Sequence, residues 1–167
     1  ILSVDALADA LWLWLQHNNF QRAIWIGNSF GCQILAALAV KHPDAVAGLV
    51  LQGPTVDRHA RSLPRQIWRD WRNGRLESHR PPGELAMMRD HIERRLTYIT
   101  APTLLLRGSR DPVSPARWVE ELAALLPNGE TLTLRGGTHT LHFVYPWSFC
   151  RAIRPFLARI QQENHHE

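Results

Sequence analysis

The motif G-N-S-F-G at residues 27–31 constrains this chain most, because it joins two elements of different kinds. Residues 23–26 before it form a short continuous apolar run, which is typical of a strand buried on both faces. Residues 32–42 after it predict a helix that ends at Pro43. So tight a turn predicts a strained backbone at Ser29, with its hydroxyl above the sheet at the helix N-terminus. The two glycines are expected to leave room for the neighbouring strand and helix.

The alternation of strands and helices continues along the chain. Apolar runs predict further strands at 46–51, 103–106 and 131–134, and helical spacing predicts helices at 4–15, 115–126 and 147–160. This alternation favours an α/β fold, a parallel sheet flanked by helices with right-handed crossovers. In such sheets the reactive residues gather in loops beyond the carboxyl ends of the strands.

Composition narrows the range of possible functions. The 167 residues suit one domain overall. Ten arginines between Arg58 and Arg95 accompany five acidic residues, so this segment carries the excess positive charge. Its arginines alternate with apolar residues, which is typical of a solvated amphipathic helix face, and we expect no nucleic-acid partner.

The sequence shows no pattern typical of a targeting segment or of a cofactor site. No run approaches the roughly 18–20 apolar residues of a spanning helix, so we expect no membrane span. There is no basic-then-apolar leader, which favours a cytoplasmic location. The two cysteines form neither a disulfide framework nor a C-x-x-C pair, and we expect neither a metal nor a cofactor. The first residue is Ile1, which predicts a processed chain or a piece of a longer one.

An acidic residue and a histidine follow two of the predicted strands. Asp111 lies in the loop after the strand at 103–106, and His139 follows a glycine pair after the strand at 131–134. Both are therefore expected at the same sheet edge as Ser29. The competing candidates are Asp57, which follows the strand at 46–51, and His142.

The order serine, aspartate, histidine along the chain resembles that of the α/β-hydrolase fold family. The matching segments are the turn at 27–31, G-S-R-D-P-V-S-P at 108–115, and G-T-H-T-L-H at 137–142 with Pro146 and Phe149 after it. The resemblance covers essentially the whole chain. It implies hydrolase core at 1–54 and 101–167, with a helical cap inserted at 55–100.

The resemblance implies a serine hydrolase acting on small-molecule carboxylic esters or related acyl compounds. Ser29 would be the nucleophile, His139 the general base, and Asp111 the acid that orients it. The Phe30 N–H would give half of the oxyanion hole. The alternatives are a carbon–carbon bond hydrolase of the same fold, and a non-catalytic α/β-hydrolase-like binding protein or inactive fragment.

The resemblance also carries two expectations about the parts around the site. Four side chains within the cap are expected either to line an apolar substrate pocket or to pack the cap helices: Trp68, Trp71, Met87 and Met88. Family members have further strands before the turn, whereas one helix precedes it here. We therefore expect the C-terminal portion of a longer hydrolase, or a chain completed by another chain, with an open strand edge at 23–26. In the family, the loop after one of those further strands gives the second oxyanion-hole N–H, so we expect weak or absent activity from this chain alone. The sequence predicts no particular oligomeric state.

Overall fold

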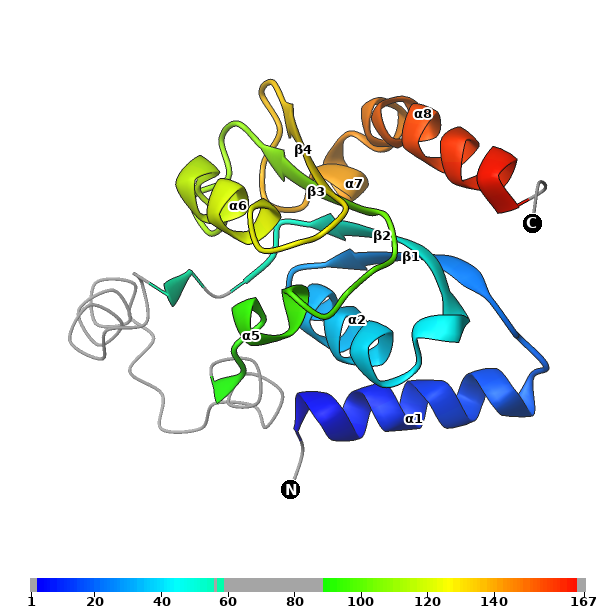
Figure 1. The fold of residues 1–167 in the computed structure, drawn as a ribbon. Coiled ribbons are helices and arrows are strands. Elements are labelled where there is room, and N and C mark those ends of the chain that lie inside the picture. The colour runs from blue at the N-terminus through cyan, green and yellow to red at the C-terminus, as the bar shows by residue number, and fades with distance from the viewer. Residues whose placement is uncertain (1–2, 56, 59–88, 165–167) are drawn as a thin grey trace.

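A four-stranded parallel sheet forms the centre of the protein, as the computed structural model shows (Figure 1). The structure describes residues 3–55, 57–58 and 89–164. The strands are β1 (Ala23–Asn28), β2 (Val46–Gln52), β3 (Thr103–Gly108) and β4 (Gly129–Leu134), and they lie side by side in chain order. Every pairing is parallel, which confirms the predicted sheet.

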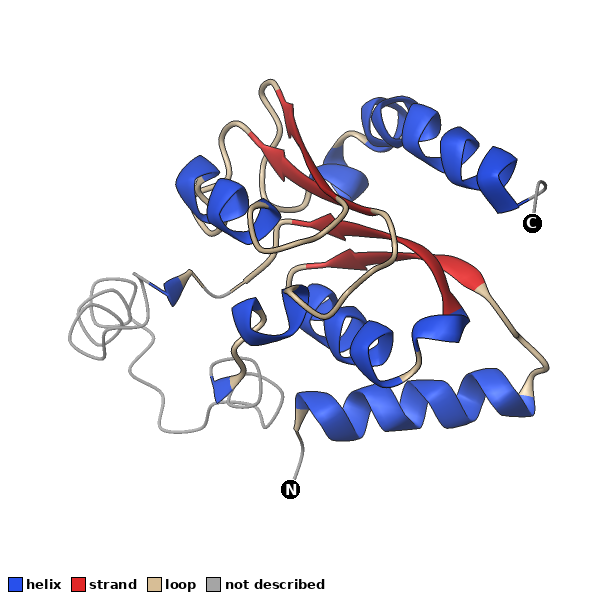
Figure 2. Cartoon of the chain, in the orientation of Figure 1, coloured by secondary structure: helices blue, strands red, loops and turns tan. Residues whose placement is uncertain are grey.

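Helices cover both faces of this sheet (Figure 2). The described helical elements are α1 (Val4–His17), α2 (Phe30–Lys41), the short 3₁₀ turn η1 (Pro43–Ala45), α5 (Glu93–Leu96), α6 (Ala116–Ala123), α7 (Leu141–Val144) and α8 (Pro146–Asn164). One face carries α2, α5 and α6, with α1 packed outside α2, and the other carries α7 and α8 (Figure 1). The resulting three-layer arrangement leaves the strand ends free to carry the site.

Alternation along the inner strands divides the core into two parts. Leu49 and Leu51 of β2 face the cluster formed with α2, whereas Val50 between them faces α8. Every residue of β2 is buried, as predicted for a strand covered on both faces. Since each fully buried aliphatic side chain stabilises the fold by roughly 1.5–3 kcal/mol, a register slip in β2 would be costly.

The first strand differs from its prediction. In the described part of the chain β1 pairs with β2 alone and lies at the sheet edge. Ile26 is 50% exposed, so the predicted burial of residues 23–26 on both faces is wrong. The open edge expected at residues 23–26 explains the difference, because an edge strand has a neighbour on one side and is less covered than an inner strand.

The stretch between β2 and β3 is described only at its two ends. In the described part of the predicted helix at 84–96, the helical element is the four-residue α5, and residues 90–92 before it are not helical. Residues 84–88 lie outside the described residues. The predicted helical patch at 65–72 lies outside the described residues.

Two glycines bring the ends of β3 and β4 into close contact. A Cβ atom added to Gly108 would lie 2.2 Å from the carbonyl oxygen of Gly137 and 2.8 Å from the Thr138 nitrogen. The Arg110 N–H also donates to the Gly137 carbonyl over 2.9 Å. The loop after β3 can therefore approach the loop after β4 only because residue 108 has no side chain.

We expect Gly108→Ala to lower the free energy of unfolding by about 1–3 kcal/mol, because the added methyl meets backbone rather than a movable side chain. Urea denaturation of the variant and the wild type measures this difference. Gly31→Ala is the matched control, since a Cβ there has no described atom within 4 Å. The control should stay within about 1 kcal/mol of the wild type. A Gly108→Ala protein as stable as the control would contradict the contact.

Candidate active site

Ser29 occupies the turn between β1 and α2 in a backbone conformation that a serine rarely adopts. Its φ is 53° and its ψ is −115°, and its N–H donates to the Gln52 carbonyl over 2.9 Å. A non-glycine residue at positive φ is strained and persists only where its surroundings hold it. Residue 29 is half-buried.

The two glycines of this turn differ in what they allow. A Cβ on Gly27 would lie 2.9 Å from the Gly31 carbonyl carbon and 2.9 Å from Leu35 Cδ1. A Cβ on Gly31 would have no described atom within 4 Å. The expectation that both glycines leave room therefore holds for Gly27, while the described residues give no steric reason for Gly31.

Three side chains from three strand ends meet at this edge of the sheet. The Nε2 atom of His139 lies 3.0 Å from the Ser29 hydroxyl oxygen. Its Nδ1 atom lies 2.9 Å from the Asp111 Oδ2 atom. The side chain of His139 is 21% exposed, whereas that of Asp111 is fully buried. The arrangement is a continuous chain of contacts from the buried Asp111 carboxylate through the His139 ring to the Ser29 hydroxyl.

Backbone donors hold the Asp111 carboxylate in place. Its Oδ1 atom accepts hydrogen bonds from the N–H groups of Val113 (2.8 Å) and Ser114 (3.1 Å). Burial acts to raise the pKa of Asp111, but the hydrogen bond from His139 and those from Ser114 and Val113 outweigh it. The pKa of Asp111 is therefore lowered, and the carboxylate is kept charged beside the imidazole.

The buried Arg107 side chain also holds the loop after β3 in place. The Arg107 Nε–H donates to the Ser114 carbonyl over 2.8 Å, and its Nη2 group donates to the Asp111 carbonyl over 3.4 Å. The Ser114 hydroxyl in turn donates to the Pro54 carbonyl over 3.2 Å. These bonds tie the loop after β3 to its own strand and to the segment after β2.

Gly53 is a site residue that the sequence analysis did not single out. It follows β2 with a φ of +59°, and a Cβ there would lie 3.0 Å from His139 Nδ1 and 3.2 Å from Asp111 Oδ2. A side chain at this position would press on the hydrogen bond between those two atoms. The signal available in the sequence was the Gly53-Pro54 pair at the end of a strand.

The competing candidates lie elsewhere. Asp57 is buried with its Oδ2 atom 3.5 Å from the Arg117 Nη2 atom of α6. His142 has its Nδ1 atom 2.7 Å from Gln52 Oε1, and its ring packs edge-on against Phe149. The structure therefore brings Asp111 and His139 to Ser29, and directs Asp57 and His142 to other partners.

Of the remaining predicted site residues, the structure describes Phe30 alone. Phe30 is the first residue of α2, so its N–H is among the helix donors that lack an intrahelical acceptor. The predicted pocket residues lie outside the described residues: Trp68, Trp71, Met87 and Met88.

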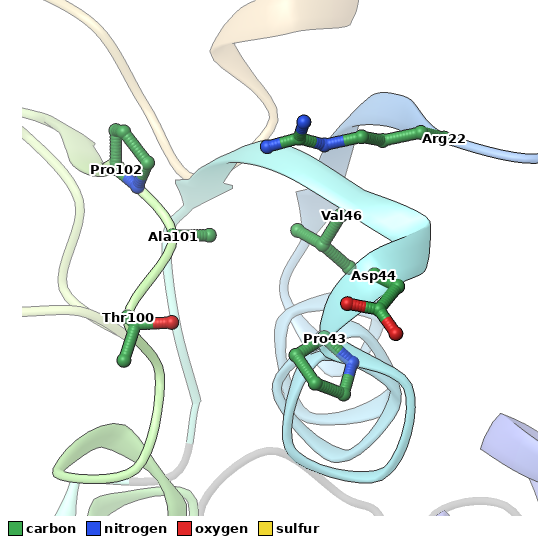
Figure 3. A pocket seen from close by; sticks show the side chains of 7 residues that line it. All are labelled: Arg22, Pro43, Asp44, Val46, Thr100, Ala101 and Pro102. Carbon is green, nitrogen blue, oxygen red and sulfur yellow. The ribbon is translucent and has the colours of Figure 1, made fainter. Parts of the chain in front are cut away.

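A surface hollow of about 470 Å³ lies away from these side chains, near the beginnings of the strands (Figure 3). Its lining residues are Arg22, Pro43, Asp44, Val46, Thr100, Ala101 and Pro102. Since Val46 begins β2 and Pro102 precedes β3, this hollow is at the edge opposite Ser29 and is not part of the candidate site.

The described residues hold neither a cluster of metal ligands nor a membrane-spanning helix. No group of three or more histidine, cysteine or acidic side chains there could hold a metal ion. None of the described helices combines the length and apolar character needed to cross a membrane.

Family comparisons agree with the fold. Residues 2–80 match the family model described as α/β hydrolase fold, and residues 83–164 match a second one, described as TAP-like protein. The chain belongs to the α/β-hydrolase fold family.

Individual relatives match parts of the chain. Human Protein NDRG2 is 42% identical over 69 residues, which are 41% of this chain and 17% of that protein. A pimeloyl-[acyl-carrier protein] methyl ester esterase of Xanthomonas oryzae pv. oryzae is 31% identical over 72 residues, 43% of this chain and 28% of the esterase. The chain thus spans less than a third of the length of these curated relatives.

Solved structures share the fold over nearly the whole chain. A thermophilic esterase from Thermogutta terrifontis has a TM-score of 0.73 at 22% identity, covering 96% of this chain and 74% of the esterase. Rv0554 from Mycobacterium tuberculosis has a TM-score of 0.77 at 18% identity, covering 95% and 73%. At these identities the likeness concerns the fold alone.

The lowered pKa of Asp111 predicts a specific pH dependence. Its charge stabilises the folded state above the ordinary aspartate pKa of 3.8, and this contribution is lost as the pH falls through the lower folded-state pKa. We expect Asp111→Asn to be less stable than the wild type at pH 7. The difference should begin to shrink below about pH 4, where the carboxyl of the unfolded state is protonated, and should vanish once the pH has fallen through the lower folded-state pKa. Urea denaturation across this range measures it, and a difference that stays constant with pH would contradict the assignment.

Proposed function

We propose that this protein is a serine hydrolase that acts on carboxylic esters or related acyl compounds. The observation that carries the proposal is the pair of contacts made by the His139 ring, 3.0 Å to the Ser29 hydroxyl and 2.9 Å to the Asp111 carboxylate. A hydroxyl, an imidazole and a carboxylate in this order are the groups that nucleophilic acyl transfer requires.

In the proposed reaction the Ser29 oxygen attacks the carbonyl carbon while His139 Nε2 removes the hydroxyl proton. The Asp111 carboxylate holds the proton on His139 Nδ1, which keeps Nε2 free to act as the base, and it stabilises the imidazolium that forms. The imidazolium then gives its proton to the leaving alcohol, and an acyl-enzyme remains on Ser29. Water, activated by the same imidazole, releases the acid and restores the serine.

The developing negative charge on the carbonyl oxygen needs donors that are already in position. The Phe30 N–H is suited to this role, because it follows Ser29 directly and belongs to the first turn of α2. The positive end of the helix dipole adds to the stabilisation there. We propose the Phe30 N–H as one donor of the oxyanion hole.

The comparisons favour an ester among acyl substrates. Two similar proteins are named esterases, the Xanthomonas oryzae protein and the Thermogutta terrifontis protein. The side chains proposed to line an apolar pocket remain those of the sequence prediction: Trp68, Trp71, Met87 and Met88.

A fluorophosphonate probe tests the proposal, since it reacts with activated serines. We expect labelling of the wild type at Ser29, no labelling of Ser29→Ala, and hydrolysis of short p-nitrophenyl esters that depends on the same serine. Asp111→Asn should lower turnover by about 10⁴-fold, because the imidazole loses the partner that fixes its tautomer.

The matched control is Asp57→Asn, which removes a buried carboxylate near the end of the neighbouring strand. It should label and turn over as the wild type does. Correct folding of the full-length protein without labelling or ester hydrolysis would favour the non-catalytic binding protein. Loss of activity in Asp57→Asn with activity kept in Asp111→Asn would make Asp57 the acid.

A further inference from the structure

Gln52, the last residue of β2, is completely buried although its side chain is polar. Its Nε2 atom lies 2.7 Å from the His139 carbonyl oxygen, and its Oε1 atom lies 2.7 Å from His142 Nδ1. The Asn28 amide also donates to Oε1. One amide is thus bonded to the residue before Ser29, to His139 of the loop after β4 and to His142 of α7.

The chemistry of these groups allows one assignment of their protons. A backbone carbonyl can only accept, so the NH₂ group of Gln52 must face the His139 carbonyl. The oxygen of Gln52 then faces His142, and its short contact requires that His142 Nδ1 carries a proton. Neutral His142 is therefore in the Nδ1–H form, with its Nε2 unprotonated.

We propose that Gln52 is a positioning residue for His139, and that His142 fixes the orientation of the Gln52 amide. This inference rests on the proposed function, because it concerns how the imidazole of that site is aimed. The role of Gln52 is to hold the His139 backbone at the distance from which the ring reaches both Ser29 and Asp111.

The position of Gln52 at the end of β2 suits this role. Its own backbone carbonyl accepts from the Ser29 N–H over 2.9 Å, so a single residue is bonded to the serine turn and to the histidine loop. The Asn28 amide lies 3.3 Å from the His139 carbonyl as well, which closes the network. Because β2 is buried along its whole length and pairs with β1 on one side and β3 on the other, Gln52 is anchored at the end of an inner strand.

The first test replaces Gln52 by methionine, which keeps the length of the side chain and removes both hydrogen-bonding groups. We expect the rate of fluorophosphonate labelling and kcat for short p-nitrophenyl esters to fall by about 10- to 100-fold, with little change in KM, since small misplacements of a catalytic group have effects of this size. The low-field proton resonance of His139 Nδ1–H should weaken or shift at the same time.

Thr103→Val is the matched control. Thr103 begins β3 at the opposite edge, and its buried hydroxyl donates to the Ala101 carbonyl over 2.9 Å. The variant therefore loses one buried hydrogen bond without touching the site, and it should keep both the labelling rate and the resonance. If Gln52→Met lost rate but kept the His139 resonance of the wild type, a general structural effect would replace positioning and overturn the proposal.

A second test needs no substitution. The nitrogen chemical shifts of the neutral His142 ring in the wild type should show the proton on Nδ1, and a proton on Nε2 would overturn the proposed orientation of Gln52. Gln52→Glu is the variant to use if the methionine variant does not fold. Its carboxylate can still accept from His142 but cannot donate to the His139 carbonyl, so it should show the same loss.

The two proposals fail in different ways. A folded wild type that shows no labelling contradicts the proposed function, and the His142 tautomer and the His139 resonance still test the role of Gln52. A wild type that labels, together with a Gln52→Met protein that labels equally fast, contradicts only the positioning role.

Discussion

Parallel pairing of four strands in chain order is the constraint on which the site depends, because it brings all carboxyl ends to one edge of the sheet. Ser29, Asp111 and His139 are 82 and 28 residues apart along the chain, yet each follows the end of a strand. Buried β2 separates the serine strand from the acid strand and sets their spacing. The two apolar clusters on its faces therefore stabilise the site as well as the fold.

The sequence was sufficient for those features that depend on local pattern. Apolar runs and helical spacing predicted each of the four strands and most helices, and the strand-end rule predicted where Ser29, Asp111 and His139 would lie. Their mutual distances agree with that placement. The prediction was possible because a reactive residue that follows a strand can be recognised in the sequence. A parallel sheet then brings the ends of several strands to the same edge.

The features that escaped prediction all depend on contacts between distant segments. Gln52 follows the predicted strand at 46–51, and its bond to the His139 carbonyl depends on a loop 87 residues away. Gly53 and Gly108 likewise matter through a close approach that only the folded chain creates.

Together, these contacts between distant segments hold the strained Ser29 beside the oriented imidazole of His139. The positive φ of Ser29 is maintained by its N–H bond to the Gln52 carbonyl, and the Asp111 carboxylate is held by two backbone donors before any ligand arrives. Groups oriented in advance need little reorganisation when charge develops, which is where most of the stabilisation of a transition state originates. The strain at Ser29 is thus balanced by packing and hydrogen bonds from β2 and β3. A substitution that weakens those strands would therefore displace the Ser29 hydroxyl even if it did not contact it.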